Sequence, residues 1–560
     1  MNYKQIIKSF IDISFIGYLL NFKANKSNFE LLGKNKFINV TNYWKTQTER
    51  IKSSPEINIL VDSLMFHPSY NEKNFLTANI IREKRQGSLY ALLPFSNSTS
   101  IKFFARLFNI NKFISVYSLL NIKAIFLSLF QTLNLLPKLK YEITKGIEIY
   151  IDGIEIGALV YDEFLRKSDM HTYRKISFVY VLFIYRCLYH YYVYKDVIKK
   201  HQITDIVCGH PVYAIWGLLT VAASSLNRDI KIWNWRNLGG NKLDIINYLA
   251  QIPIPKPKYY NLEYEALIIN HFKEKELSLE TEIEKVIKQK FAGALVDRDA
   301  INVFKANKIL TVDEFNNEYH YDHKKKNIFL FSHAFVDAVR YARWSLFSDH
   351  YTWLEQTLKY ISANNLDANI FIKPHPSEHL YPCKMTAASL VDTLNHDSKV
   401  NFICLTNQVS NNVIFEMADL VITASGTVSA EAPMFGLNVL VAGENDCENA
   451  KAIIQPLNIQ EYFYRIMNFK NIGVLDSDTI KRAKLAFYWY NKLTYVYLPI
   501  SIDSLDISLD NNNKTQIISW LELMDKTYKN NINYSIKKSE ILSALNFSLK
   551  NNFQDLFYLK

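Results

Sequence analysis

The tetrapeptide KPHP at residues 373–376 has the clearest chemical potential in the chain, because it directly follows a short apolar run. Its two prolines restrict the backbone on either side of His375 and would present the imidazole at the end of a strand. Lys373 and His375 can both donate hydrogen bonds to a phosphate. With Pro376 they predict one half of a phosphate site. A turn histidine that binds no ligand is the alternative, since the chain has two further His-Pro pairs.

A second pattern that suits anions begins at Ser425, after another apolar run. Ser425, Gly426 and Thr427 open a predicted helix, where small or hydroxyl residues leave backbone N–H groups at the positive end of the helix dipole. Glu431, one turn inside, can accept hydrogen bonds from ribose hydroxyls. The alternative is a capping box, with Thr427 as cap and Glu431 as a surface acid. Because KPHP follows a neighbouring predicted strand, we interpret the two patterns as one nucleotide-phosphate site.

The first half of the chain offers carboxylates for the opposite side of such a site. Asp152 follows a predicted strand, and Asp162 lies in a loop-to-helix segment further along. A carboxylate at either place can act as general base for an acceptor hydroxyl, so Asp152 and Asp162 remain rival candidates. Both positions also suit an ordinary turn or helix start. Other side chains expected on this acceptor side are Glu163, Arg166, His210 and Tyr213.

Strands that alternate with helices must position these candidates. Short apolar runs rich in Val, Ile and Phe, separated by helical patterns, favour two α/β units of Rossmann type with parallel sheets. Ligands of such sheets lie beyond the carboxyl ends of the strands. The sequence therefore predicts two lobes that face a cleft, with extra helices at both chain ends. His333, which follows the first strand of the second lobe, is expected to line the cleft or to hold its turn.

The expected divisions of the chain follow from where the strand patterns begin and fade. Residues 1–320 would form the acceptor-binding lobe, with a helical basic insertion near 65–146. Residues 321–490 would form the second lobe, with the phosphate site, and residues 491–560 a C-terminal helical extension. Five strand candidates support the second lobe, at 327–332, 369–374, 401–405, 419–424 and 438–443.

The composition is that of a globular protein with a basic excess. The 560 residues are 49% hydrophobic and 21% charged, and 65 Lys and Arg against 54 Asp and Glu give a net charge of +11. Residues 101–146 hold seven basic residues and one acid, among apolar residues at helical spacing. We expect this segment to contact an anionic membrane or an acidic glycan, with a solvated helix face as the plainer alternative. A nucleic-acid binder is the non-enzyme alternative, but no reading motif joins the basic residues, so we expect no nucleic acid.

Several familiar chemistries lack their residues in this chain. The patterns GxGxxG, GxxxxGK(S/T), HExxH and GxSxG do not occur, so dehydrogenase, P-loop, zinc peptidase and α/β-hydrolase functions are disfavoured. The five cysteines form no CxxC pair, which argues against structural zinc and favours a reducing compartment. We expect no metal and no other cofactor. No apolar run reaches the roughly 20 uncharged residues that a membrane-spanning helix needs.

Four segments resemble the bacterial capsule polysaccharide biosynthesis family of glycosyltransferases, which includes the capsular Kdo transferases. They are FSHAFVDA (331–338), IKPHPSE (372–378), ADLVITASGTVSAEA (418–432) and IGALVYDEFLR (156–166). The resemblance covers roughly residues 145–465. It implies a GT-B fold, a nucleotide-sugar donor held mainly by the second lobe, and no metal at the active site. The His-Pro and Ser/Thr elements also resemble those of bacterial sialyl- and polysialyltransferases, which use CMP-activated donors. Those enzymes carry an acid-acid-Gly motif where this chain has Ile151-Asp152-Gly153.

The resemblance implies a metal-independent, inverting glycosyltransferase. Its donor would be a nucleotide sugar such as a CMP-linked ulosonic acid (Kdo or a nonulosonic acid), and its acceptor a capsular or other cell-surface polysaccharide or lipid-linked glycan. We expect a cytoplasmic protein, peripheral on the inner face of the bacterial membrane through residues 101–146. Two related enzyme classes stay open: a UDP-sugar 2-epimerase, which needs no acceptor, and a CDP-glycerol glycerophosphotransferase.

Overall fold

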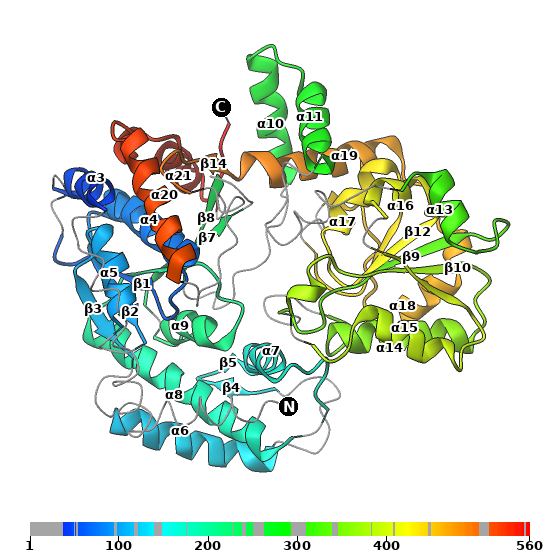
Figure 1. Ribbon diagram of the computed structural model, residues 1–560, viewed down its shortest axis with the longest axis horizontal. Helices are drawn as coiled ribbons and strands as arrows, with labels where there is room; N and C mark the ends of the chain where they lie inside the picture. The colour runs from blue at the N-terminus through cyan, green and yellow to red at the C-terminus, as the bar shows by residue number, and fades with distance from the viewer. Residues whose placement is uncertain are drawn as a thin grey trace.

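The computed structural model describes residues 37–559, apart from 50, 52–53, 95–97, 117–120, 139–147, 175, 227, 238–241, 250–261, 293–309, 339–344, 382, 407–408, 446–449, 503–513 and 554–555. Two α/β lobes lie side by side, each built on its own sheet (Figure 1). The predicted α/β class, with two Rossmann-like lobes, is confirmed. Two parts of the predicted basic segment, 117–120 and 139–146, lie outside the described residues.

The first lobe is built on a seven-stranded sheet in the order β14-β8-β7-β6-β1-β2-β3. The strands from β7 to β3 are parallel, whereas β8 and β14 run antiparallel at one edge. The predicted parallel sheet is therefore a mixed one, because β8 follows β7 too closely in the chain for a parallel crossover, which needs a dozen or more residues. The strands are β1 (Asn58–Asp62), β2 (Ser88–Leu93), β3 (Lys112–Ser115), β6 (Asp205–Cys208), β7 (Lys231–Asn237), β8 (Lys242–Leu249) and β14 (Val496–Tyr497).

The sequence predicted a helical insertion near residues 65–146, and this prediction is wrong. The segment supplies one edge of the first sheet. β2 and β3 lie within it and extend the sheet from β1. Both are short apolar runs between strongly helical stretches. Their local pattern does not separate a buried strand from a helix turn, and the pairing with β1 decides the outcome.

Helices cover both faces of the first sheet, because successive side chains of each strand point to opposite faces. Leu60 and Ile206 pack on one face against helices α7, α8 and α9, and α6 packs outside α8. Val61 and Val207 pack on the other face against α3, α4 and α5. These helices are α3 (Ile38–Thr48), α4 (Pro68–Arg85), α5 (Thr99–Leu107), α6 (Ile122–Leu135), α7 (Gly157–Ser168), α8 (Phe178–Lys200) and α9 (Ala214–Ser224).

The second lobe is built on a five-stranded parallel sheet in the order β11-β10-β9-β12-β13. All five strands coincide with the five candidates expected from the sequence. They are β9 (Asn327–Phe331), β10 (Asn369–Lys373), β11 (Phe402–Cys404), β12 (Leu420–Thr423) and β13 (Val439–Val441). The helices that pack on the two faces include α13 (Val312–Glu318), α14 (His350–Ala363), α15 (Ala387–Asn395), α16 (Asn411–Met417), α17 (Val428–Glu431) and α18 (Ile459–Met467).

The chain leaves the second lobe through α19 (Ser477–Tyr488) and returns to the first. Figure 1 shows α19 running between the lobes, next to α10 (Leu262–Glu274) and α11 (Leu279–Phe291). Beyond it, β14 pairs with β8, and α20 (Lys514–Asn530) and α21 (Glu540–Lys550) join the core that α3, α4 and α5 build. The predicted extension 491–560 is thus an integral part of the first lobe.

The returning helices should be needed for the stability of the first lobe. Trp520 of α20 is 1% exposed, and its ring lies 5.6 Å from that of Phe104 in α5. We expect Trp520→Ala to lower the free energy of unfolding by about 3–5 kcal/mol, because it removes a large buried side chain and leaves a cavity. Leu457→Ala, at a position 88% exposed, is the matched control and should change it by less than about 0.5 kcal/mol. Urea denaturation of both variants checks the prediction, which fails if the two behave alike.

Candidate functional site

A cavity of about 310 Å³ lies where elements of both lobes meet. Two of its lining residues were predicted from the sequence: His210, which follows β6, and Thr427, which follows β12. Both therefore lie beyond the carboxyl ends of parallel strands, the expected place for ligands. The other lining residues are Tyr70, Gly209, Trp235, Arg236, Lys290, Tyr490, Asn491 and Tyr495.

The wall of the cavity in the first lobe depends on a glycine. A Cβ atom at Gly209 would lie 2.4 Å from ring atoms of Trp235. Only glycine therefore lets the indole pack against the backbone that follows β6. The indole N–H of Trp235 donates to Asn74 Oδ1 at 2.7 Å, which fixes the ring as a flat wall. An aromatic wall of this kind suits the apolar face of a sugar or a base.

Asp62, at the carboxyl end of β1, is a candidate that the sequence analysis missed. The hydroxyl of Tyr70, which lines the cavity, donates to Asp62 Oδ2 at 2.7 Å. Asp62 is fully buried, and this burial raises the pKa of its carboxyl to about 6, although the bonds from Tyr70 and the Leu64 N–H lower it. The signal was in the sequence, since the apolar run INILVD at 57–62, a typical buried strand, ends in this aspartate.

Positive charge enters the cavity from both sides. Arg236 lies on β7 and pairs with the buried Asp244, with Nε 3.2 Å from Oδ2. Lys290 of α11 lies 3.9 Å from Glu431 Oε1. Glu431 is buried and accepts a bond from Asn411 Nδ2 at 2.9 Å, and burial raises its pKa. Glu431 is therefore not a surface acid, and its role as ribose ligand stays a prediction.

The predicted helix after β12 is shorter than expected. α17 spans four residues and continues as a 3₁₀-helix, Ala432–Phe435, which ends at Gly436 with φ +80°. Thr427 makes no side-chain capping bond, so the capping-box alternative is wrong. The Ser425 N–H donates to His333 Nε2 at 3.3 Å, and the Gly426 N–H to Thr423 Oγ1 at 3.2 Å. Two of the N–H groups expected to face a phosphate are thus engaged within the lobe.

Three histidines stack beside this loop. The His333 ring lies 4.0 Å from that of His350 and 6.3 Å from that of His375, with interplanar angles of 11° and 13°. His375 Nδ1 accepts the Ser377 N–H at 3.3 Å, which assigns the proton of the neutral ring to Nε2. The strands that precede His375 and Ser425 are not the neighbours that the sequence predicted, because β9 lies between β10 and β12. His333, which follows β9, lies beside both, and the structure adds His350, which the sequence analysis did not identify.

Lys373 does not point toward this loop. Its side chain is buried, and the ammonium donates to the carbonyl oxygens of Thr406 at 3.0 Å and Val409 at 2.8 Å. Burial lowers the pKa of Lys373 to about 8. These contacts correct its predicted role as a phosphate ligand to that of an anchor for the chain after β11. The neighbouring Pro376 carbonyl lies 3.0 Å from a ring nitrogen of His379.

Neither rival base lines the cavity. Asp152 is in the turn of a hairpin formed by β4 (Tyr150–Ile151) and β5 (Ile154–Glu155), with φ +49°, rather than at the end of a parallel strand. It pairs with Lys195 and accepts from Tyr191 Oη at 2.5 Å, both on α8. Burial would raise its pKa, but these two partners lower it. Asp162, inside α7, is 1% exposed. The prediction of either as general base is thus not supported by the geometry.

The other three acceptor-side candidates hold the fold or join the lobes. Glu163 is buried, pairs with Lys167 at 2.7 Å and accepts the Ile215 N–H at 2.6 Å at the start of α9. Burial would raise its pKa, but Lys167 and Arg186 bring it to about 2. Arg166 and Tyr213 reach the second lobe: Arg166 donates to Tyr213 Oη at 2.6 Å, and Tyr213 donates to Asp337 Oδ1 at 2.9 Å.

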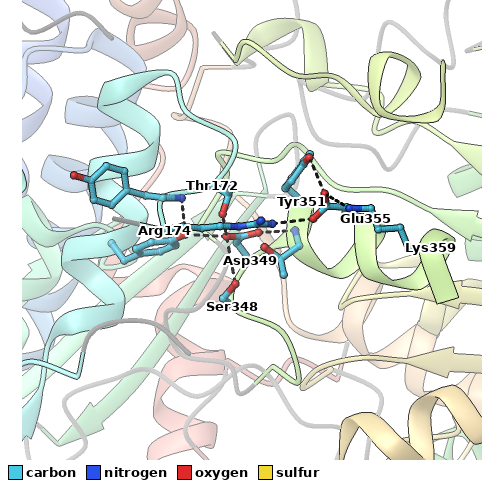
Figure 2. A network of polar contacts seen from close by, with 10 residues as sticks. Thr172, Arg174, Ser348, Asp349, Tyr351, Glu355 and Lys359 are labelled. Atoms are coloured by element: carbon cyan, nitrogen blue, oxygen red, sulfur yellow. Dashed lines mark hydrogen bonds and ion pairs between the residues drawn. The ribbon is translucent and has the colours of Figure 1, made fainter. Parts of the chain in front are cut away.

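A buried carboxylate, Asp349, joins the two lobes (Figure 2). Its Oδ2 accepts from Tyr161 Oη at 2.8 Å and from Thr172 Oγ1 at 2.7 Å, both of the first lobe. Its Oδ1 accepts the Thr352 N–H at 2.6 Å and so caps α14, whose first residue is His350. The contact between the lobes and the histidine stack therefore share one helix end.

Among the residues that the structure describes, no group of three or more His, Cys, Asp and Glu side chains is placed to hold a metal ion. The expectation of a metal-independent reaction stays a prediction.

Loss of the Asp349 carboxylate should loosen the contact between the lobes. Asp349 is 1% exposed, so Asp349→Ala leaves its hydroxyl and N–H donors without their acceptor. We expect a loss of about 3 kcal/mol in unfolding free energy. The control is Glu355→Gln, which weakens a more exposed bond between the lobes, from Arg174 at 2.8 Å, and should cost less than about 1 kcal/mol. Equal losses in urea denaturation would contradict this ranking.

No protein-family model and no curated protein sequence matches the chain. Among solved structures, KpsC of Thermosulfurimonas dismutans, a β-Kdo 2,7 transferase, is similar over 60% of this chain and 89% of that chain, at 14% identity and a TM-score of 0.29. The UDP-GlcNAc 2-epimerase of Neisseria meningitidis is similar over 77% of this chain and 97% of that chain, at 9% identity and a TM-score of 0.22. The wall teichoic acid polymerase TagF is similar over 93% of this chain and 99% of that chain, at 9% identity and a TM-score of 0.22. At such identities and TM-scores the likeness does not decide the substrate, so function must be inferred from the residues of the cleft.

Proposed function

We propose that the protein transfers a sugar from a nucleotide-activated donor to a hydroxyl group of a glycan acceptor. The observation that carries this proposal is the cavity between the lobes, which has strand ends of both sheets, two cationic side chains and aromatic walls around one space of about 310 Å³. A transfer reaction needs two substrates to meet in one place shielded from water. A cavity lined from both lobes fits that need.

The donor side is the loop after β12 with the neighbouring cation of α11. Thr427 lines the cavity there, and Lys290 adds positive charge from α11. A nucleoside phosphate that leaves the sugar develops negative charge, and a cation held near it stabilises that charge. His375, with its Nε2 proton, is the second candidate for this role. Glu431 is 3.9 Å from the Lys290 ammonium and would hold its position.

The acceptor side is the pair of Tyr70 and Asp62, which replaces Asp152 and Asp162 as candidate base. In this step the acceptor oxygen bonds to the anomeric carbon while the bond from that carbon to the phosphate oxygen breaks. The proton of the acceptor hydroxyl passes to Tyr70 Oη, whose own proton passes to Asp62. A carboxyl with a pKa of about 6 is ionised at neutral pH and still accepts a proton in the transition state. A single displacement, in which the acceptor oxygen attacks opposite the leaving phosphate, would invert the anomeric carbon.

The finer assignment of substrates rests on charge and on the resemblance of four segments to capsule glycosyltransferases. Arg236 and Lys290 favour anionic groups on donor or acceptor. We infer an acidic donor sugar such as a CMP-linked ulosonic acid, and a capsular or lipid-linked glycan as acceptor. The reaction would need no metal and would occur at the cytoplasmic side of the membrane.

The nucleotide should be identifiable by thermal-shift measurements with CMP, CDP, UDP, GDP and TDP. A ligand at about 100 times its Kd stabilises the native state by about 2.7 kcal/mol, so the bound nucleotide raises the melting temperature and the others do not. We expect CMP to raise the melting temperature. The Lys290→Met variant should need about ten times more CMP for the same rise. Lys288→Met, an exposed lysine of the same helix, is the matched control.

The result of this panel also separates the alternatives. Stabilisation by UDP rather than CMP would contradict the ulosonic-acid donor. Epimer formation from a UDP-sugar without acceptor would indicate a 2-epimerase, and stabilisation by CDP with turnover of CDP-glycerol would indicate a glycerophosphotransferase. If no nucleotide shifts the melting temperature, the proposed function is wrong.

Turnover should depend on Asp62 and Tyr70. We expect Asp62→Asn and Tyr70→Phe to lower it about 10²–10⁴-fold, while nucleotide binding remains, because each removes a step of the proton path. In the unmodified protein turnover should fall as pH drops below about 6, since Asp62 then becomes protonated. Asp152→Asn should leave turnover within about twofold. The pH profile is the decisive readout, because a purely structural role of Asp62 would not produce this acidic limb.

A further inference from the structure

The helix α6 carries its large apolar side chains on its outer face. Phe126 and Phe130 are 66% and 64% exposed, and Ile122 and Leu133 are 58% and 54% exposed. Three further leucines, Leu127, Leu129 and Leu136, are each at least 36% exposed. At 100° per residue these side chains, apart from Leu127, fall on one continuous side of the helix. A contiguous apolar surface of this kind marks an interaction site.

The inner face of α6 consists mostly of small side chains. Ala124, Ser128 and Thr132 are buried together with one large apolar residue, Leu135, on the side where α6 packs on α8. The hydroxyl of Ser128 donates to the Ile125 carbonyl at 2.9 Å, and that of Thr132 to the Ser128 carbonyl at 2.7 Å, so both are satisfied within the helix. Most of the large apolar side chains of α6 thus face outward, whereas a surface helix in water buries them.

We propose that α6 lies in the surface of an anionic lipid bilayer, with the face of Phe126 and Phe130 buried among the acyl chains. Its 14 residues span about 21 Å, too short to cross a hydrocarbon core of about 30 Å. Among the described residues, no helix is long and apolar enough to span a membrane. A helix of this length lies flat in the interface instead, with its apolar side inward.

Charge selects an anionic lipid surface over a second copy of the chain. Residues 121–138 hold two lysines, Lys123 and Lys138, and no acid. A symmetric dimer through α6 would bring two such positive faces together, which like-charge repulsion opposes. An anionic bilayer supplies the opposite charge together with an apolar interior.

The position of α6 in the fold suits this contact. Figure 1 shows α6 at the outer edge of the first lobe, against α8 and on the side away from β14, α20 and α21. The structure also divides the basic segment that the sequence pointed to. Lys102 and Arg106 lie over the Phe113 ring of β3, at 5.5 and 5.6 Å from its centroid, and so belong to the sheet edge. These two cations are therefore not part of the α6 face.

Vesicle flotation with the full chain tests the proposal. The vesicles contain phosphatidylcholine alone or with about 30% phosphatidylglycerol, and the readout is the fraction of protein that floats. We expect binding to the anionic vesicles, reduced by high salt because screening weakens the lysine contribution. Phe126→Glu with Phe130→Glu should lower the partition coefficient at least about tenfold. The matched control is Leu457→Glu with Val474→Glu, two apolar positions that are 88% and 93% exposed on the second lobe.

The proposal is overturned if the native chain does not float, if the α6 variant floats as well as the native chain, or if the control loses binding equally. It is also overturned if the native chain sediments as a dimer that the α6 substitutions convert to a monomer, since the face would then join two copies. Circular dichroism and melting temperature must be unchanged in both variants, so that lost flotation reports the surface. Flotation measures no turnover, so its outcome is independent of the proposed function.

Discussion

The structure depends on one carboxylate that belongs to both lobes at once. Asp349 uses one oxygen to cap α14 and the other to accept two hydroxyl bonds from the first lobe. A buried charge is costly unless its oxygens are fully bonded, so this carboxylate favours the arrangement in which both lobes supply their donors. His350 follows it directly and stacks on His333. The contact between the lobes and the arrangement of the histidines beside the proposed donor site therefore depend on the same carboxylate.

The wall of the cavity also depends on buried polar groups that find hydrogen-bond partners. Gly209 admits the Trp235 ring, the indole N–H is satisfied by Asn74, and Asn74 Nδ2 in turn donates to the Asp62 carbonyl at 2.7 Å. The Asp62 side chain is then held in an apolar place that raises its pKa to about 6. The architecture that packs the wall of the cavity also prepares a group able to exchange a proton near neutral pH.

The basic residues of the chain lie at separate places in the folded structure. Arg236 and Lys290 lie at the cavity, Lys102 and Arg106 at the sheet edge, and Lys123 on α6. Only the first two belong to the proposed chemistry. The last accompanies an apolar helix face, which is a separate reason for positive charge near a membrane surface.

The sequence by itself determined the second lobe almost completely. Its five strands are continuous apolar runs buried on both faces, so local pattern suffices to predict them, and parallel order then places His333, His375 and Ser425 at one edge. It did not determine which polar groups reach the cavity. Lys373 ends a strand and Glu163 lies on a helix, as expected for site residues, but each is buried and bonded to other groups of its own lobe. Asp152 lies in a hairpin turn. The raised pKa of Asp62 arises only because the tertiary packing of the first lobe buries its carboxyl group. Tertiary structure decides such roles, because burial and partners set the charge state of a side chain, and neither is encoded in its immediate neighbours.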